Sequence, residues 1–219
     1  EYTNEAISQC RMENLMAAGV VSSSMTAVGI AASNGLFGYE HRGDARFSLT
    51  VQAGDATGWS AAAHRSIDHL KVQERTLAAI KKAKSGRDVQ ELSAGTYPVI
   101  LEPAAVAGLW AWLIRSLDAK SYGKGTSPVA GKLGRHIVDE RLSLRNSPDH
   151  PDLLGEGFTP DGLPSHASVW VEHGVLQQLA HDRFTAKVAG VDPVPTLEAP
   201  FLSVEGLPVA SIQDLVKNS

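Results

Sequence analysis

The sequence is poor in the residues that mark secreted, membrane-spanning or nucleic-acid-binding chains. Cys10 is the single cysteine in 219 residues, so neither an internal disulfide nor a zinc cage of several thiolates can form. The longest apolar run, residues 104–114, is well short of the roughly 20 residues that cross a bilayer. The 20 basic and 24 acidic side chains form no basic stripe for a phosphate backbone. We therefore expect a cytoplasmic protein that binds neither membrane nor nucleic acid.

The remaining composition is that of an ordinary globular protein. Apolar residues make up 43% and charged residues 20% of the chain, and this length can bury a hydrophobic core. The first residue is glutamate and no charged-then-apolar leader follows it, so we expect the numbering to begin inside a longer chain or after processing. We predict a strand-rich segment with a helix over residues 1–94 and a β-rich region over residues 95–219.

In the first of these regions, the spacing of apolar residues changes along the chain from a helical to a strand-like pattern. Helical spacing of apolar residues predicts a short helix over the first fifteen residues. Asn34 and Gly35 lie between β-rich runs and predict a hairpin whose two turn residues both have positive φ. Residues 46–53 alternate between apolar and polar side chains, which predicts a half-buried strand, and a return strand is expected over residues 59–64.

A helix is predicted next, before Gly86, because one face repeats at helical spacing and lysines crowd its negative end. The residues of that face are Val72, Thr76, Leu77, Ile80 and Ala83.

The second region, residues 95–219, is predicted to consist of short helices and strands separated by turns. Residues 97–101 predict an apolar strand, and Pro103 then begins a buried helix that reaches Leu117, since proline suits the first helical position. Glycines over residues 123–134 predict a loop. A turn is expected over residues 159–162.

The end of this region is predicted to be mostly extended. A second hairpin is expected at His173 and Gly174, which lie between two β-rich runs. Prolines keep residues 191–208 extended, and a short helix is expected over residues 211–217. The elements together predict an α+β fold of antiparallel hairpins, or a curved sheet, with two main helices.

The chain has eight histidines, a residue type that binds metals and acts in acid–base chemistry, and two interpretations stay open for them. No pair has the spacing of His-Glu-x-x-His on a predicted helix, and the rings of His64 and His69, on either side of a strand-to-helix junction, need not converge. In one interpretation they are ordinary surface or hydrogen-bonded residues. In the other, some of them form a functional cluster that is assembled only in three dimensions. The eight are His41, His64, His69, His136, His150, His166, His173 and His181.

Nucleophilic and nucleotide-binding motifs are weak. The chain has no Gly-x-Ser-x-Gly elbow, and Cys10 has no histidine beside it in the sequence. Residues 123–127, Gly-Lys-Gly-Thr-Ser, place lysine between the glycines, and a helix precedes them instead of following, unlike a phosphate loop. They predict either a flexible connection or a loop at a subunit or substrate contact.

Trp110 and Trp112 lie two residues apart on one predicted helix and therefore point to different sides of it. Two readings stay open: both tryptophans belong to a core, or at least one meets a second packing layer or a partner.

Several segments in a fixed order resemble the TldD/PmbA family, and together they extend over residues 27–217. Residues 95–106 are similar to the family's Gly-x-Tyr-x-Val strand and helix start, and residues 123–134 to its Lys-Gly-x-Ser…Gly-Lys-x-Gly segment. Further similar pieces are Asn34 with Gly35, and residues 161–165, 171–176 and 208–216.

This resemblance implies a zinc metallopeptidase family whose active members carry His-Glu-x-x-x-His on the helix before the Lys-Gly-x-Ser segment. The matching positions here are Trp110, Ala111 and Arg115. An indole and a methyl group do not bind zinc, a guanidinium stays protonated, and no carboxylate is present to activate water. The resemblance therefore implies a TldE/PmbA-like subunit with no catalytic residue and no metal ligand of its own.

We accordingly expect an accessory subunit of a heterodimer. Its TldD-like partner would hold the zinc and cleave peptide or related amide bonds, while this chain would shape the chamber. The resemblance further implies that the family's amino-terminal α/β domain and part of its carboxy-terminal region lie outside this sequence. The residues expected to contact substrate or partner are Trp110, Arg115, Lys124, Thr126, Ser127 and Asp161. The alternatives are an independent hydrolase with a His/Asp cluster, and a structural module that binds peptides by strand addition.

Overall fold

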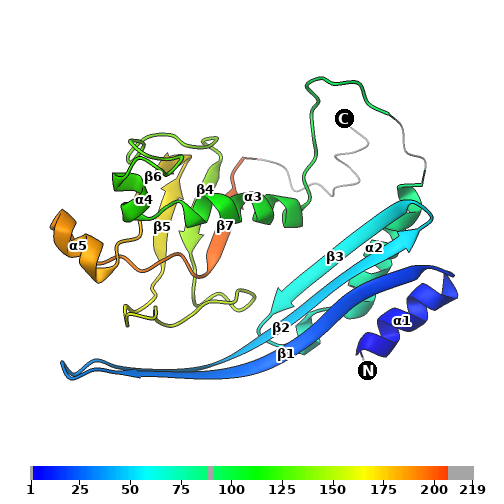
Figure 1. Cartoon of the computed structure of the whole chain (residues 1–219), viewed down its shortest axis with the longest axis horizontal. Coiled ribbons are helices and arrows are strands. Elements are labelled where there is room, and N and C mark those ends of the chain that lie inside the picture. Colours follow the sequence, from blue (N-terminus) through cyan, green and yellow to red (C-terminus); the bar gives the residue numbers. More distant parts are fainter. Residues whose placement is uncertain (1, 88–90, 207–219) are drawn as a thin grey trace. The chain divides into compact units, whose positions relative to one another are not determined.

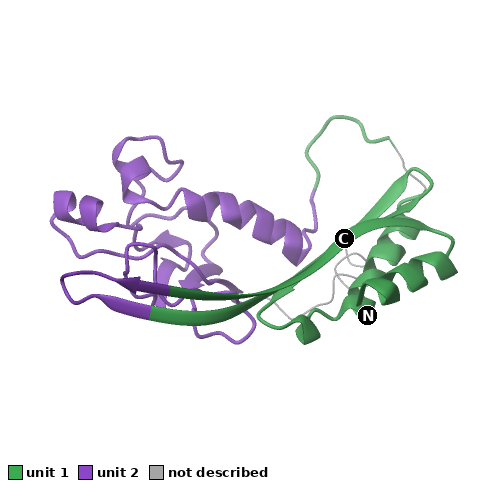
Figure 2. Cartoon of the chain, turned by 60° about the horizontal axis from the view of Figure 1, so that its bottom comes forward, with its two compact units in different colours: residues 1–28, 39–97 green, residues 29–38, 98–219 purple. Residues whose placement is uncertain are grey.

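The chain divides into two compact units, which are described separately (Figure 2). The computed structural model describes residues 2–87 and 91–206. Unit 1 contains residues 1–28 and 39–97, and unit 2 contains residues 29–38 and 98–219. Helices and antiparallel sheets occur in both, which confirms the predicted α+β class. The helix expected over residues 211–217 lies outside the described residues.

Unit 1 is built on a sheet with the strand order β1-β2-β3. Its helix α2 packs against β3, and helix α1 packs against α2 (Figure 1). The elements are α1 (Tyr2–Met12), β1 (Met16–Ala31), β2 (Phe37–Ala53), β3 (Ala56–His64), the 3-10 turn Ile67–His69 and α2 (Val72–Ser85).

The predicted half-buried strand and the helix that follows it are both confirmed. Phe47, Leu49 and Val51 of β2 are buried in the core of unit 1, and the residues between them are more exposed, because side chains alternate along a strand. The predicted face of α2 is buried except for Leu77, which is 52% exposed; Ala79 is buried on that face instead.

The hairpin between β1 and β2 is confirmed, but its turn differs from the predicted geometry. Gly35 has a φ of 88°, and Asn34 is not among the residues with positive φ. The N–H of Gly35 donates to the carbonyl of Ala32, and the N–H of Leu36 donates to the Asn34 side chain. Gly35 is the fourth of the five residues between the strands and alone takes the left-handed conformation, so Asn34 acts here through its side chain.

Unit 2 is built on a second sheet, with the order β6-β5-β4-β7. Trp170, Leu144 and Leu176 are among the side chains buried at the centre of its core. The elements are α3 (Pro103–Arg115), α4 (Ala119–Gly123), β4 (Leu142–Asn146), β5 (Ser168–Glu172), β6 (Val175–Leu176), α5 (Arg183–Ala189) and β7 (Pro200–Val204).

The second hairpin is confirmed, and here both turn residues have positive φ. His173 has a φ of 46° and Gly174 of 79°, the geometry that suits a two-residue turn between twisted strands. The predicted turn over residues 159–162 is also confirmed, since the N–H of Gly162 donates to the carbonyl of Thr159 at 2.8 Å.

Two predictions for the second region of the sequence, residues 95–219, are wrong. Residues 97–101 form no strand and are exposed, because no neighbouring strand pairs with them. The helix α3 begins at Pro103 as predicted, but none of its residues is buried. No helix in the described part of the chain has the length and apolar character to cross a membrane.

Candidate functional site

Helix α3 carries the three positions at which the resemblance places a zinc motif. Glu102 precedes the helix with extended backbone, and Pro103 takes its first turn, where a missing N–H costs nothing. The helix ends at Arg115, and the hydroxyl of the next residue, Ser116, donates to the carbonyl of Leu113 at 2.6 Å. The start of α3 is therefore defined by Pro103 and its end by a local hydrogen bond.

Trp110 and Ala111 line an apolar groove of about 470 Å³ in unit 2. Residues of α3 form one wall, and Leu144 of β4 with Leu202 and Val204 of β7 form the other. Trp110 also packs against the buried core of unit 2. This environment suits apolar side chains and offers no charged group to a ligand.

Arg115 lines a different hollow, of about 510 Å³. Trp112 and Ser116 share the α3 side of this hollow, and Thr126 and Ser127 belong to the loop after α4. The two positions that would carry the histidines of the zinc motif thus line separate hollows of unit 2. Trp112 is 77% exposed, so the two tryptophans of α3 have different roles.

The loop residues of this second hollow are engaged in their own turn. Ser127 is buried, and its hydroxyl donates to the carbonyl of Ser116 at 2.8 Å and accepts from the N–H of Val129 at 3.2 Å. The hydroxyl of Thr126 donates to the carbonyl of Ser121 at 3.3 Å. Lys124 is exposed beside these residues. Its ammonium group therefore reaches solvent.

Asp161 lines neither hollow. Its carboxylate accepts from the hydroxyl of Thr159 within the turn, and Arg183 donates to its backbone carbonyl at 3.2 Å. These contacts join the turn to the start of α5. A structural role accounts for them.

The side chains of α3 do not fit a zinc ion. The helix sequence Pro-Ala-Ala-Val-Ala-Gly-Leu-Trp-Ala-Trp-Leu-Ile-Arg contains no imidazole, thiolate or carboxylate, which are the groups that bind zinc. Among residues 2–87 and 91–206, no three histidine, cysteine, aspartate or glutamate side chains lie close enough together to hold a metal.

Two of the eight histidines do come together in unit 1. The rings of His64 and His69 stack with their centroids 4.4 Å apart and their planes 24° apart. The Nδ1 atom of His64 accepts from the N–H of Ser66 at 3.0 Å, which fixes its ring. The spacing of the two histidines in the sequence did not predict that their rings meet. The contact follows from the bend between β3 and the 3-10 turn.

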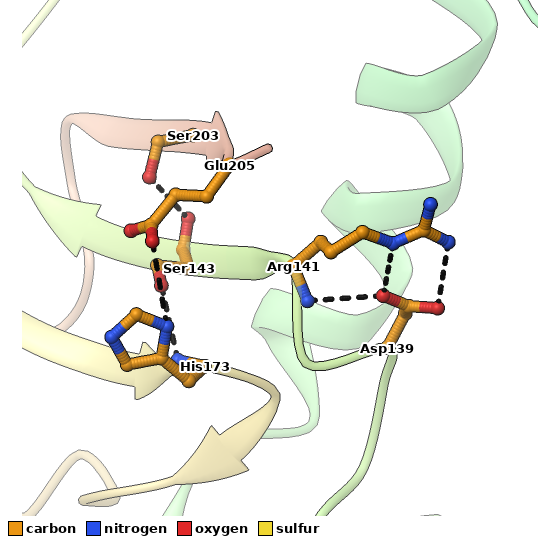
Figure 3. A network of polar contacts seen from close by, with 6 residues as sticks. All are labelled: Asp139, Arg141, Ser143, His173, Ser203 and Glu205. Atoms are coloured by element: carbon orange, nitrogen blue, oxygen red, sulfur yellow. Dashed lines mark hydrogen bonds and ion pairs between the residues drawn. The ribbon is translucent and has the colours of Figure 1, made fainter. Parts of the chain in front are cut away.

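A polar network at one end of the unit 2 sheet was not identified from the sequence (Figure 3). The Nδ1 atom of His173 lies 3.6 Å from a carboxylate oxygen of Glu205, and the N–H of His173 donates to the Ser143 hydroxyl at 3.0 Å. Ser203 donates to the carbonyl of Ser143 at 3.4 Å. The network joins the start of β4, the β5–β6 turn and the end of β7. Its one sequence signal is the His173–Gly174 turn, since β7 was not predicted.

The same end of the sheet holds a second polar pair. The Arg141 guanidinium donates to both carboxylate oxygens of Asp139 at 2.8 and 2.9 Å, and its backbone N–H donates at 3.0 Å (Figure 3). These hydrogen bonds hold the pKa of Asp139 well below its usual range. Because the carboxylate is paired with Arg141 and its pKa is low, it does not suit the role of a general base.

Family models cover nearly the whole chain. Residues 1–87 match the PmbA/TldA metallopeptidase central domain, and residues 94–216 match the PmbA/TldA metallopeptidase C-terminal domain. A protein of Archaeoglobus fulgidus named a metalloprotease is 29% identical over 75 residues, which are 34% of this chain and 18% of that protein.

Solved structures show the same fold. A candidate modulator of a DNA gyrase from Thermotoga maritima has a TM-score of 0.82 and 23% identity, with 99% of this chain and 53% of that chain covered. TldE from Thermococcus kodakarensis has a TM-score of 0.79 and 23% identity, with 98% and 53% covered. The chain thus spans about half the length of these structures. Two family models that follow one another along the sequence place the chain in the TldD/PmbA family of metallopeptidase-like proteins.

Proposed function

We propose that this chain is a non-catalytic accessory subunit of a TldD/TldE-like metalloprotease complex. The observation that carries the proposal is the composition of α3, which places Trp110, Ala111 and Arg115 where a zinc site needs two imidazoles and a carboxylate. A TldD-like partner holds the zinc in this proposal and hydrolyses peptide or related amide bonds. The present chain helps to enclose the chamber in which they are cleaved.

The outward surface of α3 supports a contact with the partner or the substrate. Trp112 is 77% and Leu109 62% exposed, on a helix whose Arg115 is its one charged side chain. Large exposed apolar residues that gather on one element mark interaction surfaces, and tryptophan and arginine are enriched where binding energy concentrates. We propose that α3 contacts the partner through Trp112 and Arg115.

The cellular setting is part of the same proposal. Cys10 is buried and unpaired in unit 1, which fits a reducing compartment. We place the complex in the cytoplasm, with a role in peptide maturation or turnover.

Reconstitution tests the proposal. The chain is purified alone and together with a TldD-type protein from the same genome, and each sample is assayed for bound zinc and for hydrolysis of an unstructured peptide. We expect zinc and hydrolysis in the mixture and neither in the lone chain. Zinc-dependent hydrolysis by the lone chain would refute the proposal.

A pair of tryptophan variants tests the contact surface. Trp112→Ala removes the exposed indole of α3, and Trp59→Ala removes an exposed indole of β3 in the other unit. We expect Trp112→Ala to weaken binding to the TldD-type partner by about tenfold or more, and Trp59→Ala to leave it unchanged. An equal loss of affinity in both variants would show that α3 is not the contact with the partner.

The second candidate, a peptide-binding module, is favoured by one feature of β7. This strand is the edge of its sheet, and the N–H of Glu205 donates to the carbonyl of Arg141 at 2.9 Å. Because such bonds alternate along a strand, Leu202 and Val204 present their backbone groups to the open edge. Their side chains line the apolar groove beside Trp110. An extended apolar peptide could therefore hydrogen-bond to the backbone of β7 and place its side chains in this groove.

Hydrogen exchange separates this candidate from the first. A peptide of alternating apolar residues is added to the lone chain, and exchange of the β7 amides is followed. Slower exchange at Leu202 and Val204 would support peptide binding, and an unchanged pattern at saturating peptide would remove it.

A further inference from the structure

The loop between β1 and β2 contains an asparagine that is followed by glycine. Of the five asparagines in the chain, only Asn34 precedes a glycine. Asn34 and Gly35 are both exposed, and their loop belongs to unit 2 (Figure 2). The peptide nitrogen that follows an asparagine can attack the side-chain amide, and glycine has no Cβ atom to hinder that approach. The sequence and the exposure therefore make this amide the one to inspect for chemical change.

One hydrogen bond of the loop prepares the side chain of Asn34 for this attack. The N–H of Leu36 donates to its side-chain oxygen at 3.2 Å. Because Gly35 lies within the ring that this bond closes, the amide carbon is held beside the Gly35 nitrogen. The same donor stabilises the negative charge that develops on the oxygen when a nucleophile adds to the amide carbon. The loop thus both positions and polarises the group that is attacked.

A second hydrogen bond opposes the attack without preventing it. The N–H of Gly35 donates to the carbonyl of Ala32 at 3.1 Å, and this proton must leave before the nitrogen can add. The bond lies in an exposed loop, where local opening needs little free energy, so it slows the attack by about tenfold at most. A Cβ atom built on Gly35 would meet no heavy atom within 4 Å. The attacking residue therefore has room to turn.

The other described asparagines lack this combination. Asn4 lies inside helix α1, and Asn14 is followed by a leucine. Asn146 is buried, and its amide group is held by three hydrogen bonds. A regular helix, a bulky following side chain and a fixed amide each keep the backbone nitrogen from the side-chain carbon. The chemistry is therefore expected at a single position.

We propose that Asn34 is a site of spontaneous covalent modification. The Gly35 nitrogen forms a bond to the side-chain amide carbon of Asn34, and the amide group leaves as ammonia, taking up the proton that the nitrogen has lost. Water then opens the cyclic imide. Cleavage of the new bond gives aspartate, and cleavage of the original backbone bond gives isoaspartate. The net reaction consumes water and releases ammonia, with no oxidant or reductant.

The modification alters a packing contact within unit 2. Leu36 lies against Gly162, since a Cβ atom built on that glycine would be 2.5 Å from the Leu36 side chain. Isoaspartate lengthens the main chain of the loop by a methylene group, and both products add a negative charge. The longer loop moves Leu36 away from the turn over residues 159–162. This inference is independent of the proposed function, which depends on the composition of α3.

Peptide mapping by mass spectrometry is the first test. The 219-residue chain is kept in mildly alkaline buffer at physiological temperature, and the conversion of each asparagine is followed by the mass change from amide to carboxylate. An isoaspartyl methyltransferase labels the isoaspartate product. We expect Asn34 to be modified about tenfold or more faster than Asn4, Asn14 and Asn146. An unmodified Asn34, or equal rates at these positions, would overturn the proposal.

A pair of glycine variants tests the attacking residue. Gly35→Ala adds a methyl group beside the nitrogen and should slow the modification of Asn34 by about tenfold or more. Gly54→Ala is the matched control, because Gly54 also has a positive φ, of 66°, in the turn between β2 and β3, with open space around it. It should leave the rate at Asn34 unchanged. Modification in Gly35→Ala as fast as in the parent chain would refute the mechanism.

Comparison with the unfolded chain tests whether the loop leaves the amide open to attack. We expect the rates at Asn34 in buffer and in concentrated urea to lie within about tenfold of each other. A folded chain slower by more than this would show that the hairpin protects Asn34, and the proposal would fail.

Hydrogen exchange tests the effect on unit 2. The isoaspartate form is separated by ion exchange, and exchange is followed at the N–H of Gly162, which donates to the carbonyl of Thr159 at 2.8 Å. We expect exchange about tenfold or more faster than in the unmodified chain, because Leu36 no longer packs on the turn. Equal exchange in the two forms would show that the turn does not respond to the modification and would overturn this part of the proposal.

Discussion

The side-chain oxygen of Asn146 accepts a hydrogen bond from the backbone N–H of Ala199 at 2.9 Å, across 53 residues of sequence. The Asn146 amide group also donates to the carbonyl of His166 at 2.9 Å and to the Ser165 hydroxyl at 3.2 Å. This side chain is buried. It therefore fixes the end of β4, the approach to β5 and the start of β7, which forms one wall of the apolar groove.

Replacing Asn146 should destabilise unit 2 strongly. Asn146→Ala leaves the N–H of buried Ala199, the carbonyl of His166 and the half-buried Ser165 hydroxyl without their partner, and we expect a loss of about 2–4 kcal/mol in the free energy of unfolding. Asn34→Ala is the control, because Asn34 is exposed and its side chain accepts one hydrogen bond, from Leu36. We expect it to cost less than about 1 kcal/mol. Urea unfolding measures both, and equal effects would contradict the structural role of Asn146.

The two tryptophans of α3 should respond differently to the same substitution. Trp110 packs against the unit 2 core, so Trp110→Ala should cost about 2–3 kcal/mol of stability. Trp112 is largely exposed, and Trp112→Ala should stay within about 0.5 kcal/mol of the parent. Thermal unfolding of both variants is the measurement. A larger loss from Trp112→Ala would mean that α3 presents the opposite face to the core.

The elements that could be predicted from the sequence are those with local signals. The Asn34–Gly35 hairpin, the start of α3 at Pro103 and the His173–Gly174 turn each depend on residues within a few positions. Helix α5 carries local signals of the same kind, since Asp182 caps its first turn and Gly190, with a φ of 68°, ends it.

The features that could not be predicted depend on distant partners. Residues 97–101 are apolar and rich in strand formers, yet no strand pairs with them. Conversely β7, which begins at Pro200, forms because β4 lies beside it. Since β7 was not predicted, neither was the groove that it forms with Trp110. The separation of Trp110 and Arg115 into two hollows likewise follows only from the packing around α3.

The ion pair between Asp44 and Arg46 should make stability depend on pH at the acid end. The Arg46 guanidinium donates two hydrogen bonds of 2.8 Å to Asp44 and lowers the pKa of that carboxyl below its ordinary value of 3.8. A carboxyl with a lowered folded-state pKa stabilises the fold above its unfolded-state pKa, and this contribution disappears as the pH falls through the folded-state pKa.

Asp44→Asn therefore should unfold at lower urea concentration than the parent chain near pH 7, and the difference should be smaller near pH 2. The effect is small because both side chains reach solvent. Arg46→Gln should show the same pH dependence. A difference that is equal at both pH values would show that the substitution acts through packing instead.

Cys10 should resist thiol reagents in the folded chain. Its side chain is 3% exposed, and burial raises the pKa of the thiol, which lowers the fraction of reactive thiolate. We expect labelling by a disulfide reagent at neutral pH to be slower by about a hundredfold or more in buffer than in concentrated urea. Labelling at equal rates would show that α1 does not stay packed on unit 1.

Zinc content is the most direct measurement of the accessory role. The lone chain and its mixture with a TldD-type protein are dialysed with zinc, and bound metal is determined together with peptide hydrolysis. We expect less than about 0.1 zinc per lone chain, because α3 supplies no ligand, and a stoichiometric ion with hydrolysis in the mixture. One tightly bound zinc and peptide turnover in the lone chain would contradict the proposed role.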